Sequence, residues 1–417
     1  NLNDVWKYVP SASTWSWVNG SSNAPQYMGI YGTQGTGSTN NTPGVRISSA
    51  MFTDASNNIW VFGGGYGLGP QYQNTYGFNS IFKYNPLNSQ WTWVNGDQGL
   101  LGAAVYGTKG TPSTSNKPGG TLNFASTTDS SGNFWIYGGI NPYGYINATD
   151  TLWSFNPTTL AWTFFSGGQD QANHNPVYGT KGVPAASNNP GSRSSTGLVV
   201  DSSGNVWLFG GNGWDSGGNN NGFNDLWKFD TTTLQWTWIA GGNVTALNGV
   251  YGTKGVAASA NGPGGRVPAG TWIDASNHIY VFGGLGYDSV NNYRDELNDL
   301  WMFNPTTLMW TWINGSNVTA SGGKNPTYGL IGSFAPTNTP GGRGNNAVSF
   351  QSSTSSFWVM GGFGVTSAND YDEGELWNYD PSSNQWACIN GCGLYIYRPT
   401  YGTLGVASAT NSPGNRC

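Results

Sequence analysis

Short apolar segments separated by turn residues recur along the chain. A clear example begins with an alternating segment at 196–200, turns through Asp-Ser-Ser-Gly-Asn at 201–205 and continues as an apolar run at 206–209. Two further segments, 224–229 and 235–239, follow a loop and a second turn. Short segments rich in Val, Ile, Phe and Trp and bounded by Gly, Asn and Asp are typical of β-strands, and no stretch has a sustained helical period. The pattern predicts a unit of four antiparallel strands.

This unit is copied along the whole sequence. A Tyr-Gly-Thr tripeptide or a near copy recurs every 72 to 77 residues, at Tyr31, Tyr106, Tyr178, Tyr251, Tyr328 and Tyr401. A pair of glycines ends the second strand of each unit: Gly63 and Gly64, Gly138 and Gly139, Gly210 and Gly211, Gly283 and Gly284, Gly361 and Gly362. We expect one domain over 1–417, as a fragment of a longer chain, with complete units at 46–95, 121–166, 193–240, 266–314 and 343–390. The segments between them are expected to be inter-unit loops.

Turn residues support this division. Asn-Pro or Asp-Pro links the third and fourth strands in most units, as at Asn304 and Pro305. Proline pre-sets the backbone and Asn or Asp caps the turn, so we expect a tight hairpin. Glycine at the end of a strand marks an unusual φ or a close backbone approach, and we interpret the glycine pairs as structural.

An apolar strand ending in Gly-Gly, then a Leu-Trp-x-Phe/Tyr strand and then a Trp, resembles the kelch repeat. Segments 205–211 (Asn-Val-Trp-Leu-Phe-Gly-Gly) and 298–303 (Asn-Asp-Leu-Trp-Met-Phe) carry the resemblance, which covers nearly the whole chain. It implies an all-β, kelch-type β-propeller of four-stranded antiparallel blades around a central axis. Kelch units run about 50 residues, so this is a long-period variant. Its extra length lies mostly in inter-blade loops that repeat Tyr-Gly-Thr-Lys-Gly.

The number of half units predicts an incomplete blade. First and second strands with their glycine pair occur five times, whereas third and fourth strands occur six times, because 1–19 reads as an extra pair. The expectation is therefore five complete blades plus one half blade, about six in the intact ring. Open propeller edges are hazardous, so we expect the absent strands to come from sequence after Cys417 or from a neighbouring subunit.

The two faces of such a propeller are unequal. In an up-and-down blade the turns after the first and third strands lie on one face, so the connections after the second and fourth strands lie on the other. One face carries only tight hairpins and the other carries all the long loops, where binding surfaces usually lie, so a partner site is expected there or on the rim. A Pro-Gly precedes a recurrent arginine at the start of the first strand: Arg46, Arg193, Arg266, Arg343 and Arg416. Its identical place in each repeat favours a structural anchor to loop carbonyls, and Thr121 takes that place in the second unit.

Composition limits the chemistry. Charged residues are 8% of the chain and the net charge is −5, so nucleic acid is not an expected partner, and no apolar run is long enough for membrane insertion. The two histidines, His174 and His278, fall on opposite faces, which excludes a shared His-based metal centre. Some kelch propellers resemble galactose oxidase, but this chain lacks the set of residues that its copper site needs. We therefore expect no enzyme, no catalytic residues and no cofactor.

Two weaker kinds of ligand site are visible. Acidic residues gather in one long loop, at Asp370, Asp372, Glu373 and Glu375, and such oxygen ligands could hold Ca²⁺. The favoured interpretation is a solvated loop without metal. Most tryptophans fit the expected core, whereas Trp214 lies outside the pattern and is a better candidate for ligand contact.

Sequons and cysteines indicate an extracellular or cell-surface glycoprotein. Six Asn-x-Ser/Thr sequons fall in long loops, at Asn19, Asn40, Asn147, Asn243, Asn314 and Asn317. The three cysteines, Cys388, Cys392 and Cys417, gather in the final unit, and two of them could pair.

The expected function is therefore a non-catalytic structural or adhesive module, with protein partners or self-assembly into a surface assembly or filament. A lectin-like carbohydrate-binding module is the alternative, with glycans as partners. A carbohydrate-active enzyme resembling galactose oxidase is less favoured, because it needs convergent polar groups that the sequence does not supply.

Overall fold

The structure is a computed structural model of the 417-residue chain. It describes residues 3–23, 28–67, 75–141, 147–170, 172–290, 294–319, 324–344, 347–353, 355–364, 374–393 and 398–414. Within these ranges it contains β-strands and one short 3-10 helix, η1 (Pro10–Ala12). The expectation of an all-β fold is confirmed.

Five sheets of four principal antiparallel strands follow one another along the chain, as the repeated apolar pattern predicts. The first and second contain β3 (Ala50–Thr53), β4 (Ile59–Phe62), β7 (Ile81–Asn85) and β8 (Gln90–Asn95), then β9 (Ala125–Thr128), β10 (Phe134–Tyr137), β13 (Leu152–Asn156) and β14 (Ala161–Ser166). The third contains β16 (Gly197–Val200), β17 (Val206–Phe209), β20 (Leu226–Asp230) and β21 (Gln235–Ala240). The fourth contains β23 (Gly270–Ile273), β24 (Ile279–Gly286), β25 (Asp295–Asn304) and β26 (Met309–Asn314), and the fifth β27 (Val348–Ser353), β28 (Ser356–Met360), β29 (Leu376–Asp380) and β30 (Gln385–Asn390).

The N-terminal residues form a sixth, two-stranded sheet. It consists of β1 (Val5–Val9) and β2 (Thr14–Asn19), which correspond to the third and fourth strands of a complete unit. Among the described residues, β1 pairs with β2 alone, whereas every other third strand also pairs with a second strand. The sheet is therefore the outer half of a unit.

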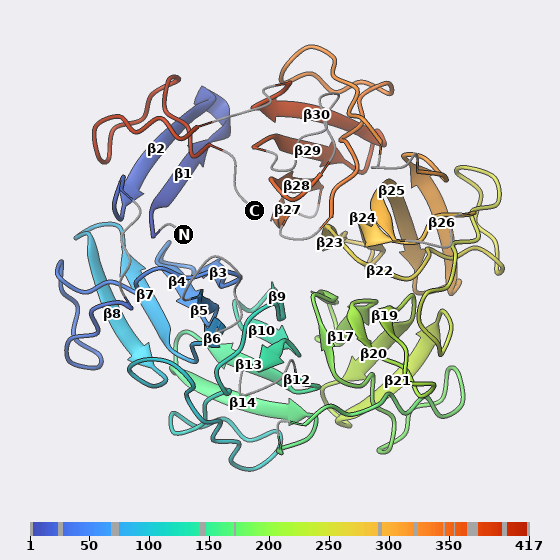
Figure 1. The fold of residues 1–417 in the computed structure, drawn as a ribbon, viewed down its shortest axis with the longest axis horizontal. Helices are drawn as coiled ribbons and strands as arrows, with labels where there is room; N and C mark the ends of the chain where they lie inside the picture. The colour runs from blue at the N-terminus through green and yellow to red at the C-terminus, as the bar shows by residue number, and fades with distance from the viewer. Residues whose placement is uncertain are drawn as a thin grey trace.

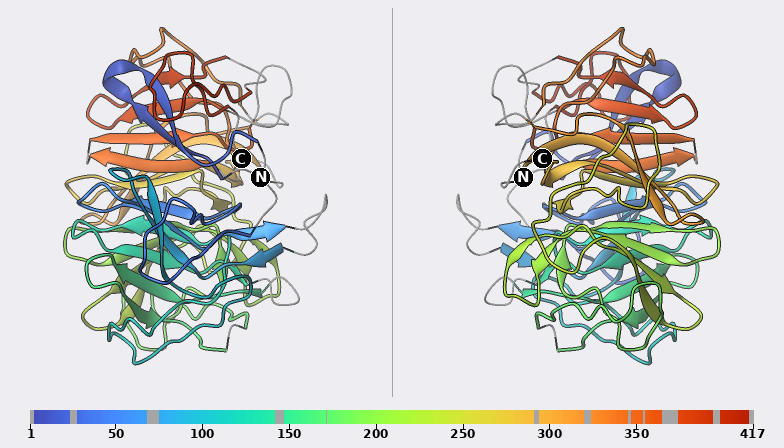
Figure 2. Two further views of the ribbon diagram at one scale, coloured as in Figure 1. Left: turned by 90° about the vertical axis from the view of Figure 1, so that its left-hand side faces the viewer. Right: turned by 90° about the vertical axis from the view of Figure 1, so that its right-hand side faces the viewer.

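Short ribbons extend several sheets. They contain β5 (Gly65–Gly67) and β6 (Thr75–Gly77), β11 (Ile140–Asn141) and β12 (Asn147–Ala148), and β15 (Arg193–Ser194), β18 (Asn212–Trp214) and β19 (Asn220–Gly222), while β22 (Arg266–Val267) pairs with the end of β24. The side views show one layer of sheets, with the ribbon around β5 and β6, drawn in blue, projecting from one face (Figure 2).

The six sheets lie in sequence order around the middle of the molecule (Figure 1). The β1–β2 pair lies between the fifth sheet, which ends with β30, and the first sheet, which begins with β3. An apolar cluster joins each sheet to the next, including one between β1–β2 and the first sheet and one between β1–β2 and the fifth. Large aromatic side chains dominate these clusters, and their burial is the main stabilising contribution available to a chain with so few charges.

The glycine pairs connect neighbouring sheets. Gly210 and Gly211 have φ values of 60° and 89°, which side chains other than glycine rarely adopt. The N–H of Gly211 donates to the carbonyl of Arg266 in the next sheet at 2.9 Å, and a Cβ on Gly210 would lie 2.8 Å from that same oxygen. Gly64, Gly139 and Gly284 donate to the corresponding carbonyls of Thr121, Arg193 and Arg343. The positive φ and the close approach of the next sheet therefore both require glycine at this position.

Candidate functional site

A buried polar cluster recurs where the first strand of a unit meets its third. In the third sheet, the guanidinium of Arg193 donates to both carboxylate oxygens of Asp225, at 2.5 and 2.7 Å. The hydroxyl of Tyr178 and the indole N–H of Trp227 also donate to this carboxylate, at 2.7 and 2.8 Å. Neither charged side chain is exposed. A buried ion pair is stable only when further hydrogen bonds satisfy it, as they do here.

The same cluster is present in the next two sheets. Arg266 contacts Asp299 at 2.6 and 2.9 Å, with Tyr251 and Trp301 as further donors. In the fifth sheet Arg343 donates to Glu375 at 2.6 Å, and Trp377 and Tyr328 donate to the same carboxylate. Sequence reasoning found the arginines and missed their partners, although the recurrent acid before Leu-Trp was a readable signal.

The arginines also contact loop carbonyls. Arg193 donates from Nε to the carbonyl of Pro190 at 2.8 Å and from Nη1 to that of Gly210 at 3.1 Å. Burial by itself would lower the pKa of Arg193, but the attraction of Asp225 outweighs it and raises the pKa. Burial and Asp225 together also raise the pKa of Tyr178. These groups hold their protons at any physiological pH, which suits a fixed connection and not proton transfer.

The first two sheets depart from this arrangement. Arg46 donates to the Ser80 hydroxyl at 2.8 Å, because serine stands where the third, fourth and fifth sheets have an acid, and burial lowers the pKa of Arg46 to about 10. In the second sheet, Thr121 replaces the arginine, and its hydroxyl lies 3.5 Å from the carbonyl of Gly138. Arg416 lies outside the described residues.

Connecting loops that begin with Tyr-Gly-Thr, or with Tyr-Gly-Leu at Tyr328, lie along the fourth strand of a sheet. A loop glycine donates to a fourth-strand carbonyl at 2.7 to 2.9 Å in all six copies: Gly35 to Trp93, Gly110 to Phe164, Gly182 to Trp238, Gly255 to Trp312, Gly332 to Cys388 and Gly405 to Trp17. The last copy places residues 401–412 on β2, so the C-terminal loop contacts the N-terminal sheet. Each loop therefore adds an outer edge to a sheet and covers it.

Only one of the predicted calcium ligands lies in the described part of the chain, and the two histidines contact different carboxylates. Asp370, Asp372 and Glu373 lie outside the described residues, and Glu375 is held by Arg343 as above. His174 contacts Asp150 and Asp170, while His278 contacts Asp274. The part of the chain that the structure describes contains no group of three or more His, Cys, Asp or Glu able to hold a metal ion.

The predicted sequons differ in exposure. Asn40 and Asn243 are exposed, Asn19, Asn314 and Asn317 are half-buried, and the side chain of Asn147 lies outside the described part. Asn19 accepts a hydrogen bond from the Trp91 indole at 2.9 Å. Exposure of the Asn side chain therefore favours Asn40 and Asn243 as glycan acceptors.

Two sequon threonines have a structural contact of their own. The Thr245 hydroxyl donates to Asp215 at 3.0 Å, and the Thr319 hydroxyl donates to Asp288 at 3.1 Å. Both contacts tie the loop after a fourth strand to the loop before a third strand. The threonine of the repeated Asn-Val-Thr therefore has a structural role, besides being part of a glycosylation sequon.

Among the cysteines, Cys388 and Cys392 form a disulfide, and Cys417 lies outside the described residues. Cys388 is buried within β30, at the position where the first, third and fourth sheets carry the second Trp of the fourth strand. The disulfide therefore ties the last fourth strand to the turn that follows it.

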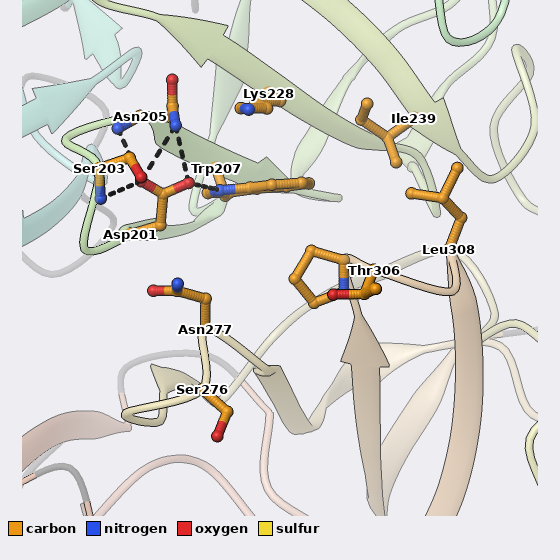
Figure 3. A pocket seen from close by; sticks show the side chains of 11 residues that line it. Asp201, Ser203, Asn205, Trp207, Lys228, Ile239, Ser276, Asn277, Thr306 and Leu308 are labelled. Carbon is orange, nitrogen blue, oxygen red and sulfur yellow. Dashed lines mark hydrogen bonds between the residues drawn. The ribbon is translucent and has the colours of Figure 1, made fainter.

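A pocket of about 300 Å³ lies between the third and fourth sheets (Figure 3). Trp207, Lys228, Asn277 and Thr306 line it together with Asp201, whose carboxylate accepts from the Trp207 indole and from the backbone of its own turn at 2.9 Å. The lining comes from tight hairpins, so the pocket is on the face opposite the long loops, where sequence analysis expected a partner. Trp214, the predicted ligand contact, is 41% exposed and does not line this pocket.

Comparison with known protein-family models and with curated proteins finds no match for this chain. Among the described residues, no helix has the length and apolar character needed to cross a membrane.

Proposed function

We propose that this chain is a kelch-type β-propeller that serves as a non-catalytic structural or adhesive module outside the cell. The observation that carries the proposal is the way in which the sheets are joined. Six apolar clusters join neighbouring sheets, the Arg-carboxylate clusters fix the first strand of a unit to its third, and six connecting loops each cover the outer edge of a sheet. The chain's aromatic and charged residues are thus used for rigidity, which a scaffold requires.

Electron microscopy of the native protein tests the architecture and the assembly. We expect class averages with a ring of six sheets, and rings repeated side by side in a surface array or filament. Single rings that stay monodisperse at high concentration would count against the assembly, and particles without a ring would count against the propeller.

The extracellular location is supported by the disulfide and by the exposed sequons. Glycopeptide mapping of native material is the direct test. We expect glycans at Asn40 and Asn243, the two exposed acceptor side chains, and lower occupancy at Asn19, whose side chain holds the Trp91 indole. Unmodified Asn40 and Asn243 in native material would argue against the glycoprotein assignment.

Carbohydrate binding is a second candidate, favoured by the pocket between the third and fourth sheets. It combines an indole with amide, hydroxyl and ammonium groups, a mixture suited to a sugar. However, Trp207 is 5% exposed and Asp201 is already satisfied by its own turn, so few of these groups are available. A glycan array with the wild type and a Lys228→Ala/Asn277→Ala variant separates the two functions: binding lost in the variant would support the lectin, and no binding by either would leave the scaffold.

A further inference from the structure

The second sheet carries a buried carboxylate at a position where other sheets carry an amide. Two residues before the Leu-Trp of the third strand (Ile-Phe in the first sheet), the second sheet has Asp150, whereas the first, third and fourth sheets have Asn79, Asn224 and Asn298. The side chain of Asp150 is only 2% exposed. A buried carboxylate is unfavourable without a counter-charge or several hydrogen-bond donors, so its surroundings must differ from those of the asparagines.

A histidine supplies the positive charge beside Asp150. The arginine that pairs with an acid in the third, fourth and fifth sheets is absent here, because Thr121 takes its place, and Arg193 at the start of the next sheet pairs with the acid of its own sheet. Nδ1 of His174 lies 3.2 Å from a carboxylate oxygen of Asp150, and Nε2 lies 3.2 Å from one of Asp170. An ionised carboxylate only accepts hydrogen bonds, and a neutral imidazole has a single N–H. Only the imidazolium can therefore donate to both carboxylates.

These contacts lie where the loop after β14 meets the segment that enters the third sheet. Asp150 also accepts from the N–H of Gly168 at 2.9 Å and from Nδ2 of Asn189 at 2.6 Å. The N–H of His174 donates to the Ser192 hydroxyl at 2.8 Å, and the N–H of Ser192 donates to the His174 carbonyl at 2.8 Å. His174 and Asp150 therefore connect the second sheet, its outgoing loop and the start of the third unit.

The other titratable groups around His174 keep their charge state near neutral pH. Burial, followed by the charges of Asp150 and Asp170, raises the pKa of Tyr106 to about 12, and burial and Asp150 raise the pKa of Tyr137 as well. A backbone hydrogen bond lowers the pKa of Asp170. Burial by itself would lower the pKa of His174, but the two aspartates outweigh it and raise that pKa. His174 is thus the group whose charge changes between about pH 5 and about pH 8.

We propose that His174 forms a pH-sensitive connection at this junction: the imidazolium holds the loop after β14 to Asp150, and loss of one of its two ring protons releases one of the two carboxylates. Since the folded pKa of His174 is raised, the connection stabilises the fold fully below the ordinary histidine value of 6.5 and is lost as the pH rises through the folded value. The junction between the second and third sheets is therefore firmer in acidic than in alkaline surroundings. This inference goes beyond the scaffold function and does not rest on it, because it concerns contacts within one chain.

The second histidine of the chain provides a matched comparison. Among the described residues, His278 contacts a carboxylate through Nδ1 alone, at 2.9 Å from Asp274, so a neutral ring with its proton on Nδ1 satisfies the contact. The corresponding hairpins of the first three sheets have asparagine in this place, at Asn58, Asn133 and Asn205. His278→Asn should therefore keep the fold, and it leaves His174 as the only histidine of the 417-residue chain.

The first test is an NMR titration of the His174 ring in the His278→Asn variant. We expect a midpoint above the ordinary histidine value of 6.5. Adding Asp150→Asn should lower the midpoint, because the amide carries no charge, and it should keep the fold, because three other sheets have asparagine at this position. A midpoint at or below 6.5, or one that Asp150→Asn leaves unchanged, would overturn the proposal.

The second test measures hydrogen exchange at two equivalent amides. Gly168 donates to Asp150 at 2.9 Å and Gly242 donates to Asn224 at 2.9 Å, so Gly242 is an internal reference whose acceptor is neutral at every pH. Between about pH 5.5 and about pH 8, we expect Gly168 to lose protection relative to Gly242 in the wild type. This loss should disappear in His174→Gln, which has no titrating ring at the junction.

A constant ratio of the two protection factors in the wild type, or an equal loss in His174→Gln, would contradict the connection. Circular dichroism of each variant distinguishes global unfolding from a local effect. If His174→Gln does not fold, Asp150→Asn gives the same measurement with the residue that the other sheets use, and its relative protection should be independent of pH.

Discussion

The five complete sheets and the two-stranded N-terminal sheet use the same repeated sequence with different burial. The third strand shows this directly: Trp227 and Phe229 on β20 are fully buried, whereas Trp6 and Tyr8 on β1 are half-buried. The fourth strands of the two kinds of sheet are buried alike. Trp15 on β2 is 7% exposed and is covered by a connecting loop, as its counterparts in the complete sheets are. Burial in this fold is thus decided by the neighbouring hairpin and not by the local sequence.

The largest expected effect lies in the complete sheets, at the buried ion pair. Asp225→Asn would leave the Arg193 guanidinium buried without a counter-charge and weaken the bonds from Tyr178 and Trp227. We expect the free energy of unfolding, measured by urea denaturation, to fall by about 4–5 kcal/mol.

Ser80→Ala in the first sheet is the matched control for this prediction. It removes the hydroxyl that Arg46 contacts but no charge, so we expect a loss of about 1 kcal/mol. Equal losses in the two variants would show that the carboxylates do not distinguish the third sheet from the first.

A second prediction compares two phenylalanines at one register position. Phe52→Ala should lower the free energy of unfolding by about 3–4 kcal/mol, because Phe52 stacks on Phe134 at 4.4 Å in a closed interface. Phe350→Ala should cost about 1 kcal/mol, since much of that ring already faces solvent. If both variants lose the same stability in urea, the Phe350 ring is not exposed to solvent as the structure has it.

The strands and their order could be predicted from the sequence with little error. The segments expected at 206–209 and 235–239 are β17 and, within one residue, β21, because alternation, turn residues and a strict repeat all agree there. The predicted half unit at 1–19 is the two-stranded sheet. The ribbon of β5 and β6 was not predicted, because its Gly-Tyr-Gly and Thr-Tyr-Gly segments are too short for a period.

The remaining contacts depend on tertiary structure that a repeat pattern does not encode. The connecting loops join fourth strands through backbone atoms of glycine and of alanine or serine, such as Gly182 and Ala185, so no apolar pattern marks them. Arg193 and Asp225 are 32 residues apart, and only the fold brings them together. The pocket is lined by residues from two neighbouring units, so it depends on how those units pack and not on the sequence of either one.

A third prediction concerns acid stability and the loop contacts of Asp215. Burial alone would raise the pKa of Asp215, but hydrogen bonds from Asn219 and Thr245 outweigh it and lower the pKa to about 2. An unfolded aspartate has a pKa of about 3.9, so the stabilisation is fully present above that value and is lost as pH falls toward 2. Asp215→Asn should therefore cost about 2–3 kcal/mol at pH 7, and the difference from the wild type should shrink below pH 4. A constant difference down to pH 2 would contradict this account.

The smallest expected effect distinguishes the fifth sheet from the third and fourth. In the third and fourth sheets the second Trp of the fourth strand packs under a lysine, as Trp238 does under Lys181 at 4.1 Å. The fifth sheet has Cys388 at this position, with its disulfide to Cys392. Closing so short a loop restricts the unfolded chain by about 2 kcal/mol at most. Reduction should lower the free energy of unfolding of the wild type by this amount or less and leave a Cys392→Ala variant unchanged. A larger loss on reduction would mean that the disulfide also holds β30 against its loop at Gly332, whose N–H donates to the Cys388 carbonyl, so that the fifth sheet depends on a covalent link where its neighbours depend on packing.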